Sequence, residues 1–371
     1  MIAKQLKEKH GLLMDILYFV SGLALLVIGA ELLVRGSSRL ALSLGISPLV
    51  IGLTVVAFGT SSPELAVSVK SAMEGKAGLS LGNVVGSNIF NVLFILGLSA
   101  LIIPLTVAQQ IIRFDVPIMI GLSFLLLLVS LDGNIGRLDG IIFFAGLIIY
   151  TTYIIYKSKS ETKEIQEEYK AEFNGRKSEP YDWIRYSGFV TVGLLLLVLG
   201  SEWLVNSAIV FAHMFGVSEV VIGLTIVAAG TSLPELVTSI IASVRNERDI
   251  AVGNVVGSNI FNIMGVLGLS GILSDSGIAV SPAFLGFDIP IMIGVAFACL
   301  PIFFSGGRIT RLEGLLFFAY YIIYTVYLVM NTTKHDSLPL YNFIVMYYLL
   351  PITAVTLLVI AYQEYRKRLK A

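Results

Sequence analysis

The sequence predicts an all-α integral membrane protein: an inverted repeat of two five-helix halves (ten transmembrane helices) plus an extra C-terminal transmembrane helix. Of the 371 residues, 56% are hydrophobic and 13% are charged, whereas soluble domains carry about 25% charged residues. About eleven apolar runs are long enough to cross a bilayer, which takes about 18 residues or more. One decapeptide, GNVVGSNIFN, occurs twice, starting at Gly82 and at Gly253.

The repeat extends beyond the decapeptide. Residues 50–99 align with residues 221–270 without a gap, at a constant offset of 171 and with 28 identities in 50 positions. Further matches lie upstream and downstream, so each half holds about five helices in the same order. Because five is odd, the second half enters the membrane from the opposite side. Such inverted repeats are typical of secondary transporters, whose sites lie near the midplane between the halves.

These matches predict four regions. The first five-helix repeat spans residues 1–156, and a cytoplasmic linker with seven basic and seven acidic residues spans 157–185. The second, inverted repeat spans 186–331. An extra helix and a basic tail occupy 332–371. The first apolar run lacks a small-residue cleavage site, so we expect no cleaved signal peptide.

The basic residues predict the orientation, because Lys and Arg accumulate in cytoplasmic loops. Of the 25 basic residues, eighteen fall on the side of the linker and seven on the other. The N-terminus is therefore expected outside and the C-terminus in the cytoplasm, in a multi-pass protein of the cell membrane. The expected partners are inorganic cations and the lipid bilayer, with no nucleic acid and no obligatory protein partner.

Glu64 and Glu235 are the leading candidates for a functional site. They end the matching segments AFGTSSPE and AAGTSLPE. A carboxylate near the middle of a membrane helix costs about 2.5–3.5 kcal/mol and marks function by default. An inverted repeat can bring the two face to face, where ionised carboxylates about 6 Å apart repel by roughly 3 kcal/mol. The pair must therefore hold a cation or take up a proton.

Proline next to each glutamate predicts a helix break that supplies further oxygens. Pro63 and Pro234 lack an amide proton and clash with the preceding turn, and freed carbonyls are tolerated where they line a polar cavity. The candidate carbonyl ligands are those of Ala57, Thr60, Ala228 and Thr231. Calcium takes six to eight such oxygens. Ser61 and Ser232 lie on the same helix faces as the glutamates.

The decapeptides add a polar stripe at i, i+4, i+8 spacing. Its members are Asn83, Ser87 and Asn91 in the first copy and Asn254, Ser258 and Asn262 in the second. The stripe would form a neutral, oxygen-bearing wall against the glutamate helix. For Asn83, Asn88, Asn254 and Asn259, interhelical hydrogen bonding is an equal alternative.

The remaining polar residues point elsewhere. Glu31 and Glu202 lie near helix ends and are expected at the interface, whereas Asp115 and Asp288 start helices, where a carboxylate suits the helix dipole. Cys299 is the only cysteine, so neither a disulfide nor a cysteine metal site is expected. The three histidines fall in unrelated places, which argues against a zinc site, and we expect no cofactor.

At these motifs the chain resembles the cation/calcium antiporter superfamily, in its sodium/calcium exchanger branch of prokaryotic type. The GTSSPE and GTSLPE motifs and both decapeptides are similar to that family's two repeats, over residues 14–331. The resemblance implies an antiporter rather than an enzyme, with Ca²⁺ and Na⁺ as transported ions and H⁺ competing. It implies Glu64 and Glu235 as shared carboxylates. The other implied ligands are Ala57, Ala228, Thr60, Thr231, Ser61 and Ser232, with Ser87, Asn91, Ser258 and Asn262 completing the sodium sites.

Asn262 departs from some relatives that carry Asp there, so two carboxylates are expected. The linker is too short for the calcium-sensing domains of animal exchangers, and the last helix is extra. Three alternatives stay open: a proton-coupled antiporter of the same fold, a channel, and an intramembrane hydrolase using Ser61 or Ser232. The hydrolase lacks a general base. Sodium is preferred over protons, because proton exchange would not need the ring of neutral oxygens.

Overall fold

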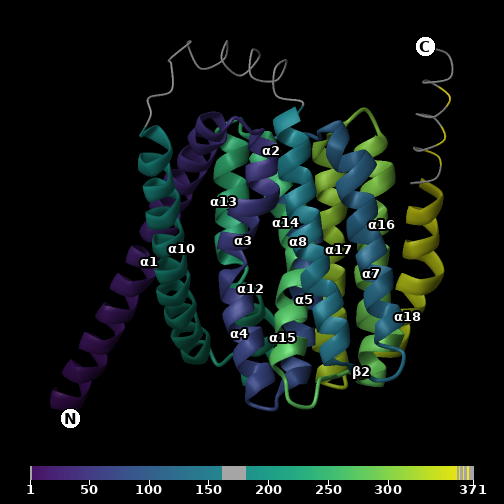
Figure 1. Ribbon diagram of the computed structural model, residues 1–371. Coiled ribbons are helices and arrows are strands. Elements are labelled where there is room, and N and C mark those ends of the chain that lie inside the picture. The colour runs from purple at the N-terminus through teal and green to yellow at the C-terminus, as the bar shows by residue number, and fades with distance from the viewer. Residues whose placement is uncertain (1, 161–180, 357–358, 360–361, 363–365, 367–371) are drawn as a thin grey trace.

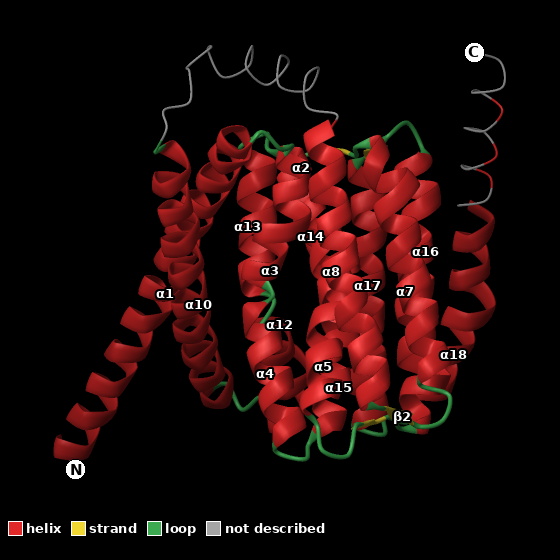
Figure 2. Cartoon of the chain, viewed as in Figure 1, coloured by secondary structure: helices red, strands yellow, loops and turns green. Residues whose placement is uncertain are grey.

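The computed structural model of the chain describes residues 2–160, 181–356, 359, 362 and 366. Helices cross between two ends of the molecule, and short loops and strands join them there (Figures 1 and 2). Helix α1 (Ile2–Leu44) rises from the lower end in Figure 1 and lies obliquely against α10 (Asp182–Met214). The remaining helices stand side by side as a bundle next to this pair.

Nine or ten membrane spans can be followed through the described residues. Nine helices are long and apolar enough to cross a membrane, and Pro48–Thr60 with Ser62–Met73 form a pair bent by 48° that makes a tenth span. The repeat counterpart of this pair is also broken, and its Leu233–Val244 part is a shorter apolar helix. The last span, Leu338–Thr356, lies outside the repeat. The predicted fold class is confirmed.

In the first half the elements after α1 follow one another with short connections. They are α2 (Pro48–Ile51), η1 (Gly52–Val56), α3 (Ala57–Thr60), α4 (Ser62–Met73), α5 (Ala77–Phe90), η2 (Asn91–Leu96), α6 (Gly97–Ile102), β1 (Leu105–Thr106), η3 (Ile111–Asp115), α7 (Val116–Val129), β2 (Asn134–Ile135) and α8 (Arg137–Ser160). The η segments are single π-helical turns within longer helices.

The second half repeats this order after α10. Its elements are α11 (Glu219–Ile222), η4 (Gly223–Val227), α12 (Ala228–Gly230), α13 (Leu233–Val244), α14 (Arg248–Phe261), η5 (Asn262–Leu267), α15 (Gly268–Leu273), β3 (Ile278–Ala279), η6 (Phe284–Asp288), α16 (Ile289–Phe304), β4 (Arg308–Ile309) and α17 (Arg311–Thr332), followed outside the repeat by α18 (Leu338–Ile344) and η7 (Val345–Leu349). Even the π-helical turns recur, since η1 and η4 are related by the offset of 171.

The predicted helix breaks are present, one residue earlier than the prolines alone would place them. Ser61 and Ser232 leave the helical conformation, with φ/ψ of −82°/9° and −90°/8°. Pro63 and Pro234 then sit in the first turn of α4 and α13, where a missing N–H costs nothing. Each proline therefore starts the new helix, and the glycine and serine before it allow the turn.

Helices α1 and α10 cross with their backbones almost touching. A Cβ atom on Gly29 would lie 2.8 Å from the carbonyl oxygen of Gly193, and one on Gly193 would lie 2.8 Å from that of Gly29. Only glycine allows this approach, as in small-xxx-small helix pairs in membranes. The two helices, one from each half, therefore pack as a unit.

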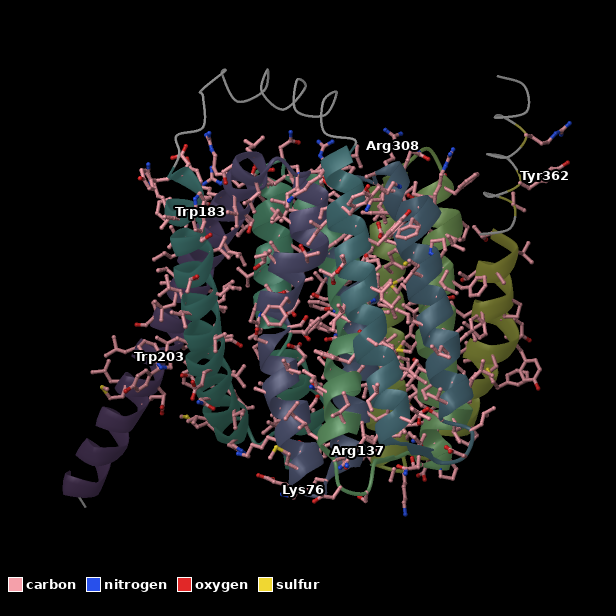
Figure 3. The ribbon with its side chains drawn as sticks, in the orientation of Figure 1. Lys76, Arg137, Trp183, Trp203, Arg308 and Tyr362 are labelled. Atoms are coloured by element: carbon pink, nitrogen blue, oxygen red, sulfur yellow. The ribbon has the colours of Figure 1, made fainter. Side chains whose placement is uncertain are left out.

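Two short antiparallel ribbons tie the halves together. β1 pairs with β4, with Leu105 opposite Ile309, and β2 pairs with β3, with Ile135 opposite Ile278. Each ribbon takes one strand from each half. The ribbons lie at opposite ends of the bundle, since Arg137, next to β2, and Arg308, in β4, lie at the lower and upper ends in Figure 3.

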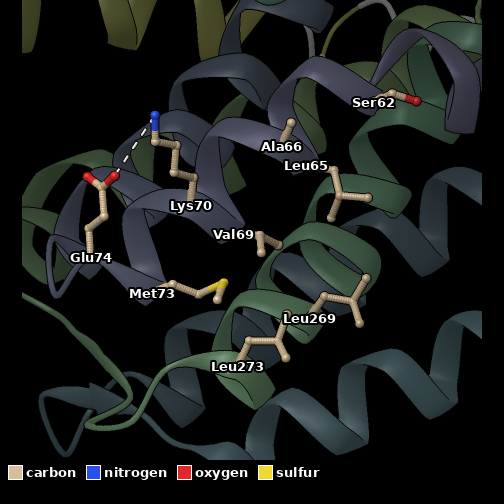
Figure 4. Close-up of a pocket in the computed structure, with 9 residues that line it drawn as sticks. All are labelled: Ser62, Leu65, Ala66, Val69, Lys70, Met73, Glu74, Leu269 and Leu273. Carbon is tan, nitrogen blue, oxygen red and sulfur yellow. Dashed lines mark ion pairs between the residues drawn. The ribbon is translucent and has the colours of Figure 1, made fainter.

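The two halves are packed differently despite their matching sequences. At the end of α13, Arg245 Nη2 lies 2.6 Å from Glu31 Oε1 of α1. The residue equivalent to Arg245 in the first half is Glu74, which instead pairs with Lys76 at 3.3 Å and Lys70 at 3.9 Å. The corresponding face of α4 is uncovered and forms, with α15, a groove of about 650 Å³ (Figure 4). The two halves thus have matching sequences but different packing in this conformation.

Candidate cation site

The two glutamates hold reciprocal positions between the halves. Ser232 Oγ donates to Glu64 Oε1 at 2.7 Å, and Ser61 Oγ donates to Glu235 Oε1 at 2.7 Å. Both glutamates are 1% exposed. The second oxygens, Glu64 Oε2 and Glu235 Oε2, are buried and accept no hydrogen bond from the described part of the chain. Each carboxylate therefore keeps one oxygen for a ligand.

The helix breaks place these carboxylates. Glu64 and Glu235 lie in the first turns of α4 and α13, immediately after the breaks at Ser61 and Ser232. The N-terminus of a helix carries a partial positive charge and favours a carboxylate there. The sequence motif therefore sets a buried negative charge beside the serine that binds the other half's glutamate.

The decapeptides carry buried side-chain oxygens, one of which lies beside the serine that bonds Glu64. Ser87 lies beside Ser232, with the two hydroxyl oxygens 3.2 Å apart. Asn91 and Asn262 follow the last residues of α5 and α14 and are 1% and 0% exposed. Their side-chain oxygens, and the Ser258 hydroxyl, are buried without a hydrogen-bond partner among the described residues. Unpartnered buried oxygens are uncommon in native proteins and call for an explanation such as a bound ion.

The threonine and alanine positions differ between the halves. Thr60 is fully buried and donates to Asn254 Oδ1 at 3.0 Å, and the Ala57 carbonyl accepts the Ser61 N–H at 3.0 Å. A carbonyl oxygen retains a second lone pair, so the Ala57 oxygen stays available. Thr231 is half-buried and Ala228 is exposed. The first-half positions are thus enclosed, and their second-half equivalents are more open.

Four asparagines surround these positions, and the sequence left their role undecided. Asn83 donates to the Glu64 carbonyl at 3.2 Å and to Ser68 at 2.9 Å, and Asn254 makes the equivalent bonds to Glu235 and Ser239 at 3.3 and 3.0 Å. They fasten each glutamate helix to the decapeptide helix of its own half. Asn88 and Asn259 instead bond across the halves. In the sequence, only their place in the two identical decapeptides indicated that these four asparagines have a role.

Three further carboxylates, Asp115 buried and Glu31 and Asp288 half-buried, have partners of their own. Glu31 contacts Arg35 and Arg245, Asp115 accepts from Tyr150 at 2.9 Å, and Asp288 accepts from Tyr324 at 3.3 Å. No cluster of three or more His, Cys, Asp or Glu side chains occurs in the described ranges. A cation held between Glu64 and Glu235 would take its other ligands from hydroxyl, amide and carbonyl oxygens.

Known proteins match both the sequence and the fold. The family model described as sodium/calcium exchanger protein matches residues 14–156 and 186–330. The putative antiporter CaxA of Alkalimonas amylolytica is 37% identical over 84% of this chain and 98% of that protein. The sodium/calcium exchanger MaX1 of Methanosarcina acetivorans is 34% identical over 85% of this chain and 98% of that protein. A solved structure of the sodium-calcium exchanger NCX_Mj covers 84% of this chain and 98% of its own, at 30% identity and a TM-score of 0.71.

Fold and matches together define a membrane transporter and not an enzyme, which removes the hydrolase alternative. The match covers both halves of the repeat and nearly the full length of each relative. The chain belongs to the sodium/calcium exchanger family, within the cation/calcium antiporter superfamily.

Proposed function

We propose that the chain is a secondary active antiporter that exchanges calcium for sodium by alternating access. One observation carries the proposal. Two buried glutamates, one from each half, are each bonded by the other half's serine, and each keeps one oxygen without a hydrogen-bond partner among the described residues. A pair of carboxylates in that arrangement supplies two negative charges to one site shared by both halves.

Calcium fits the charge and the ligand types. It prefers six to eight oxygens that mix carboxylate and carbonyl. Glu64 and Glu235 would provide the carboxylates, and the carbonyls of Ala57, Thr60 and Thr231, with that of Ala228, would provide the neutral ligands. The two charges of the ion would offset a carboxylate repulsion of roughly 3 kcal/mol at about 6 Å.

Sodium fits the surrounding neutral oxygens. Ser61 and Ser232 carry hydroxyls at the carboxylates, and the unpartnered oxygens of Asn91, Ser258 and Asn262 lie on the decapeptides, as does Ser87. A hard monovalent ion needs oxygen ligands and little charge, so these positions suit sodium when calcium leaves. The printed names of MaX1 and NCX_Mj as sodium/calcium exchangers support the same pair of ions.

Alternating access is supported by the unequal packing of the halves. The α13 end is held to α1 through Arg245 and Glu31, whereas the equivalent face of α4 lines an uncovered groove. Inverted repeats transport by exchanging the packing of one half for that of the other. The conformation described here would be one of two related states, and in the other the first half would be the covered one.

The coupling ion is tested by calcium uptake into vesicles loaded with sodium, with the pH held equal on both sides. We expect uptake to follow the sodium gradient, and an imposed pH gradient alone to drive little. The neutral oxygens give the reason, since proton exchange requires only the two carboxylates. Uptake that ignores sodium and follows the pH gradient would instead establish the proton-coupled antiporter.

Orientation is tested with a matched pair of cysteines. Lys76 and Arg308 are exposed at opposite ends of the bundle (Figure 3), and the native Cys299 is buried. We place the Arg308 end and the 157–185 linker in the cytoplasm of a cell-membrane protein, on the eighteen-to-seven distribution of basic residues. In intact cells an impermeant thiol reagent should label Lys76→Cys, and it should reach Arg308→Cys only after the cells are opened. The reverse pattern would invert the proposed topology.

A further inference from the structure

Asn88 and Asn259 form a cross-linked pair at the interface between the decapeptides. Asn88 Nδ2 donates to the Asn259 carbonyl at 3.3 Å, and Asn259 Nδ2 donates to the Asn88 carbonyl at 3.4 Å. Their second amide contacts are to methionine sulfurs, Met292 Sδ at 3.6 Å and Met119 Sδ at 3.4 Å. Both side chains are 2% exposed. The carbonyls can only accept, so each amide nitrogen must face the opposite backbone.

The orientation of the Asn88 and Asn259 amides also determines the orientation of a second pair of amides, those of Asn262 and Asn91. Because the nitrogen of Asn88 is used, its Oδ1 faces the other way and accepts from Asn262 Nδ2 at 3.0 Å. In the same manner, Asn259 Oδ1 accepts from Asn91 Nδ2 at 3.0 Å. If the amide of Asn262 or Asn91 were turned over, two oxygens would face each other. The orientation of both amides is therefore determined by backbone carbonyls two hydrogen bonds away.

The consequence lies at the other end of each amide. With their nitrogens committed, Asn91 and Asn262 turn Oδ1 away from the pair, and these are the oxygens that are buried without a partner in the described chain. An asparagine in the opposite orientation would present N–H groups, which repel a cation. The pair thus determines that an amide oxygen, and not an amide nitrogen, is left free at both positions.

We propose that Asn88 and Asn259 are positioning residues of the cation site: each sets which atom of the other half's asparagine, Asn262 or Asn91, faces the ion. The inference rests on the proposed function, because it assumes that the free amide oxygens are cation ligands. In this proposal Asn88 and Asn259 act through Asn262 and Asn91 and are not ligands themselves. Outer-shell partners of metal ligands commonly contribute about 10–100-fold to metal affinity.

The test is a double-mutant cycle in calcium affinity, measured by radioactive calcium binding to the purified full-length protein. Asn88→Leu keeps the branched shape but removes the amide, and should weaken binding by about tenfold. In an Asn262→Asp background the two side-chain oxygens are equivalent and need no orienting. There, Asn88→Leu should weaken binding by less than about threefold.

Cross-pairing provides the matched control. Asn88 orients Asn262 and not Asn91, so Asn88→Leu should keep its full effect in an Asn91→Asp background. Asn259→Leu should show the mirrored pattern, losing its effect with Asn91→Asp and keeping it with Asn262→Asp. A packing role alone would give the same loss in every background and would overturn the proposal.

Two further outcomes separate folding and function from positioning. Thermal unfolding without calcium reports whether each variant folds. If both leucine variants fail to fold in every background, the amides have a structural role and the proposal is refuted. If the unaltered chain binds calcium but shows no sodium-driven uptake, the proposed exchange is wrong even when the cycle holds. If exchange is normal and residues 88 and 262 show no coupling, only the positioning role falls.

Discussion

Glu64→Gln and Glu235→Gln should each reduce sodium-driven calcium uptake by at least about 100-fold. Each substitution removes one negative charge from a buried pair whose members are bonded by Ser232 and Ser61. Removing one partner of a buried ion pair, here a carboxylate facing the bound calcium ion, costs about 3–5 kcal/mol, and every 1.4 kcal/mol corresponds to about tenfold in affinity. Uptake into sodium-loaded vesicles, at matched protein density, measures the effect.

Glutamine keeps the shape and can still accept the serine hydrogen bond, so both variants should insert and fold. Thermal unfolding in the absence of calcium should stay within a few degrees of the unaltered protein. Glu202→Gln is the matched control, because it removes an exposed carboxylate from α10 at the same change in net charge. Near-normal uptake in either buried variant would remove that glutamate from the site.

Gly257→Ala should destabilise the protein severely, whereas Gly86→Ala, at the same position of the other decapeptide, should not. A Cβ atom on Gly257 would lie 2.7 Å from the Leu53 Cα and carbonyl oxygen and 2.9 Å from Ala57 Cβ. Overpacking against backbone costs about 1–3 kcal/mol or more. A Cβ on Gly86 would meet nothing within 4 Å, and alanine is the better helix former by about 0.5–1 kcal/mol.

The melting temperature of the purified variants, with the yield of monodisperse protein, measures this difference. The two substitutions occur in identical ten-residue sequences, so local helix propensity is matched between them. Equal melting temperatures would mean that the packing of α14 against η1 and α3 is not tighter than its counterpart, and would contradict the unequal halves.

The sequence was sufficient to predict the fold class and that each buried glutamate lies against the other half. The offset of 171 and the odd number of helices per half bring Glu64 toward the second half, and its contact with Ser232 follows this symmetry. The spacing of Ser87 and Asn91 predicts that both face the glutamate helix. These results depend only on periodicity and repeat order, which a sequence records directly.

The rest depends on conformation. Identical sequences around Gly86 and Gly257 cannot indicate that one is in close contact and the other is open. The amide directions of Asn88 and Asn259 result from backbone carbonyls of the opposite half, and no spacing rule contains them. The two-residue ribbons are too short to produce an alternating pattern, so β1 and β4 were not predicted.

The ribbons also determine when the protein can finish folding during its synthesis. Strand β1 is synthesised early, but its partner β4 is synthesised about two hundred residues later. Ser232, which bonds Glu64, follows it by 168 residues in the chain. Until then β1 lacks its strand partner at the end of the bundle, and Glu64 lacks the serine of the second half. A buried carboxylate within the membrane is costly without a partner. The tertiary structure of the first half is therefore completed only after the second half has been synthesised. The two halves are made one after the other, but they complete their fold together.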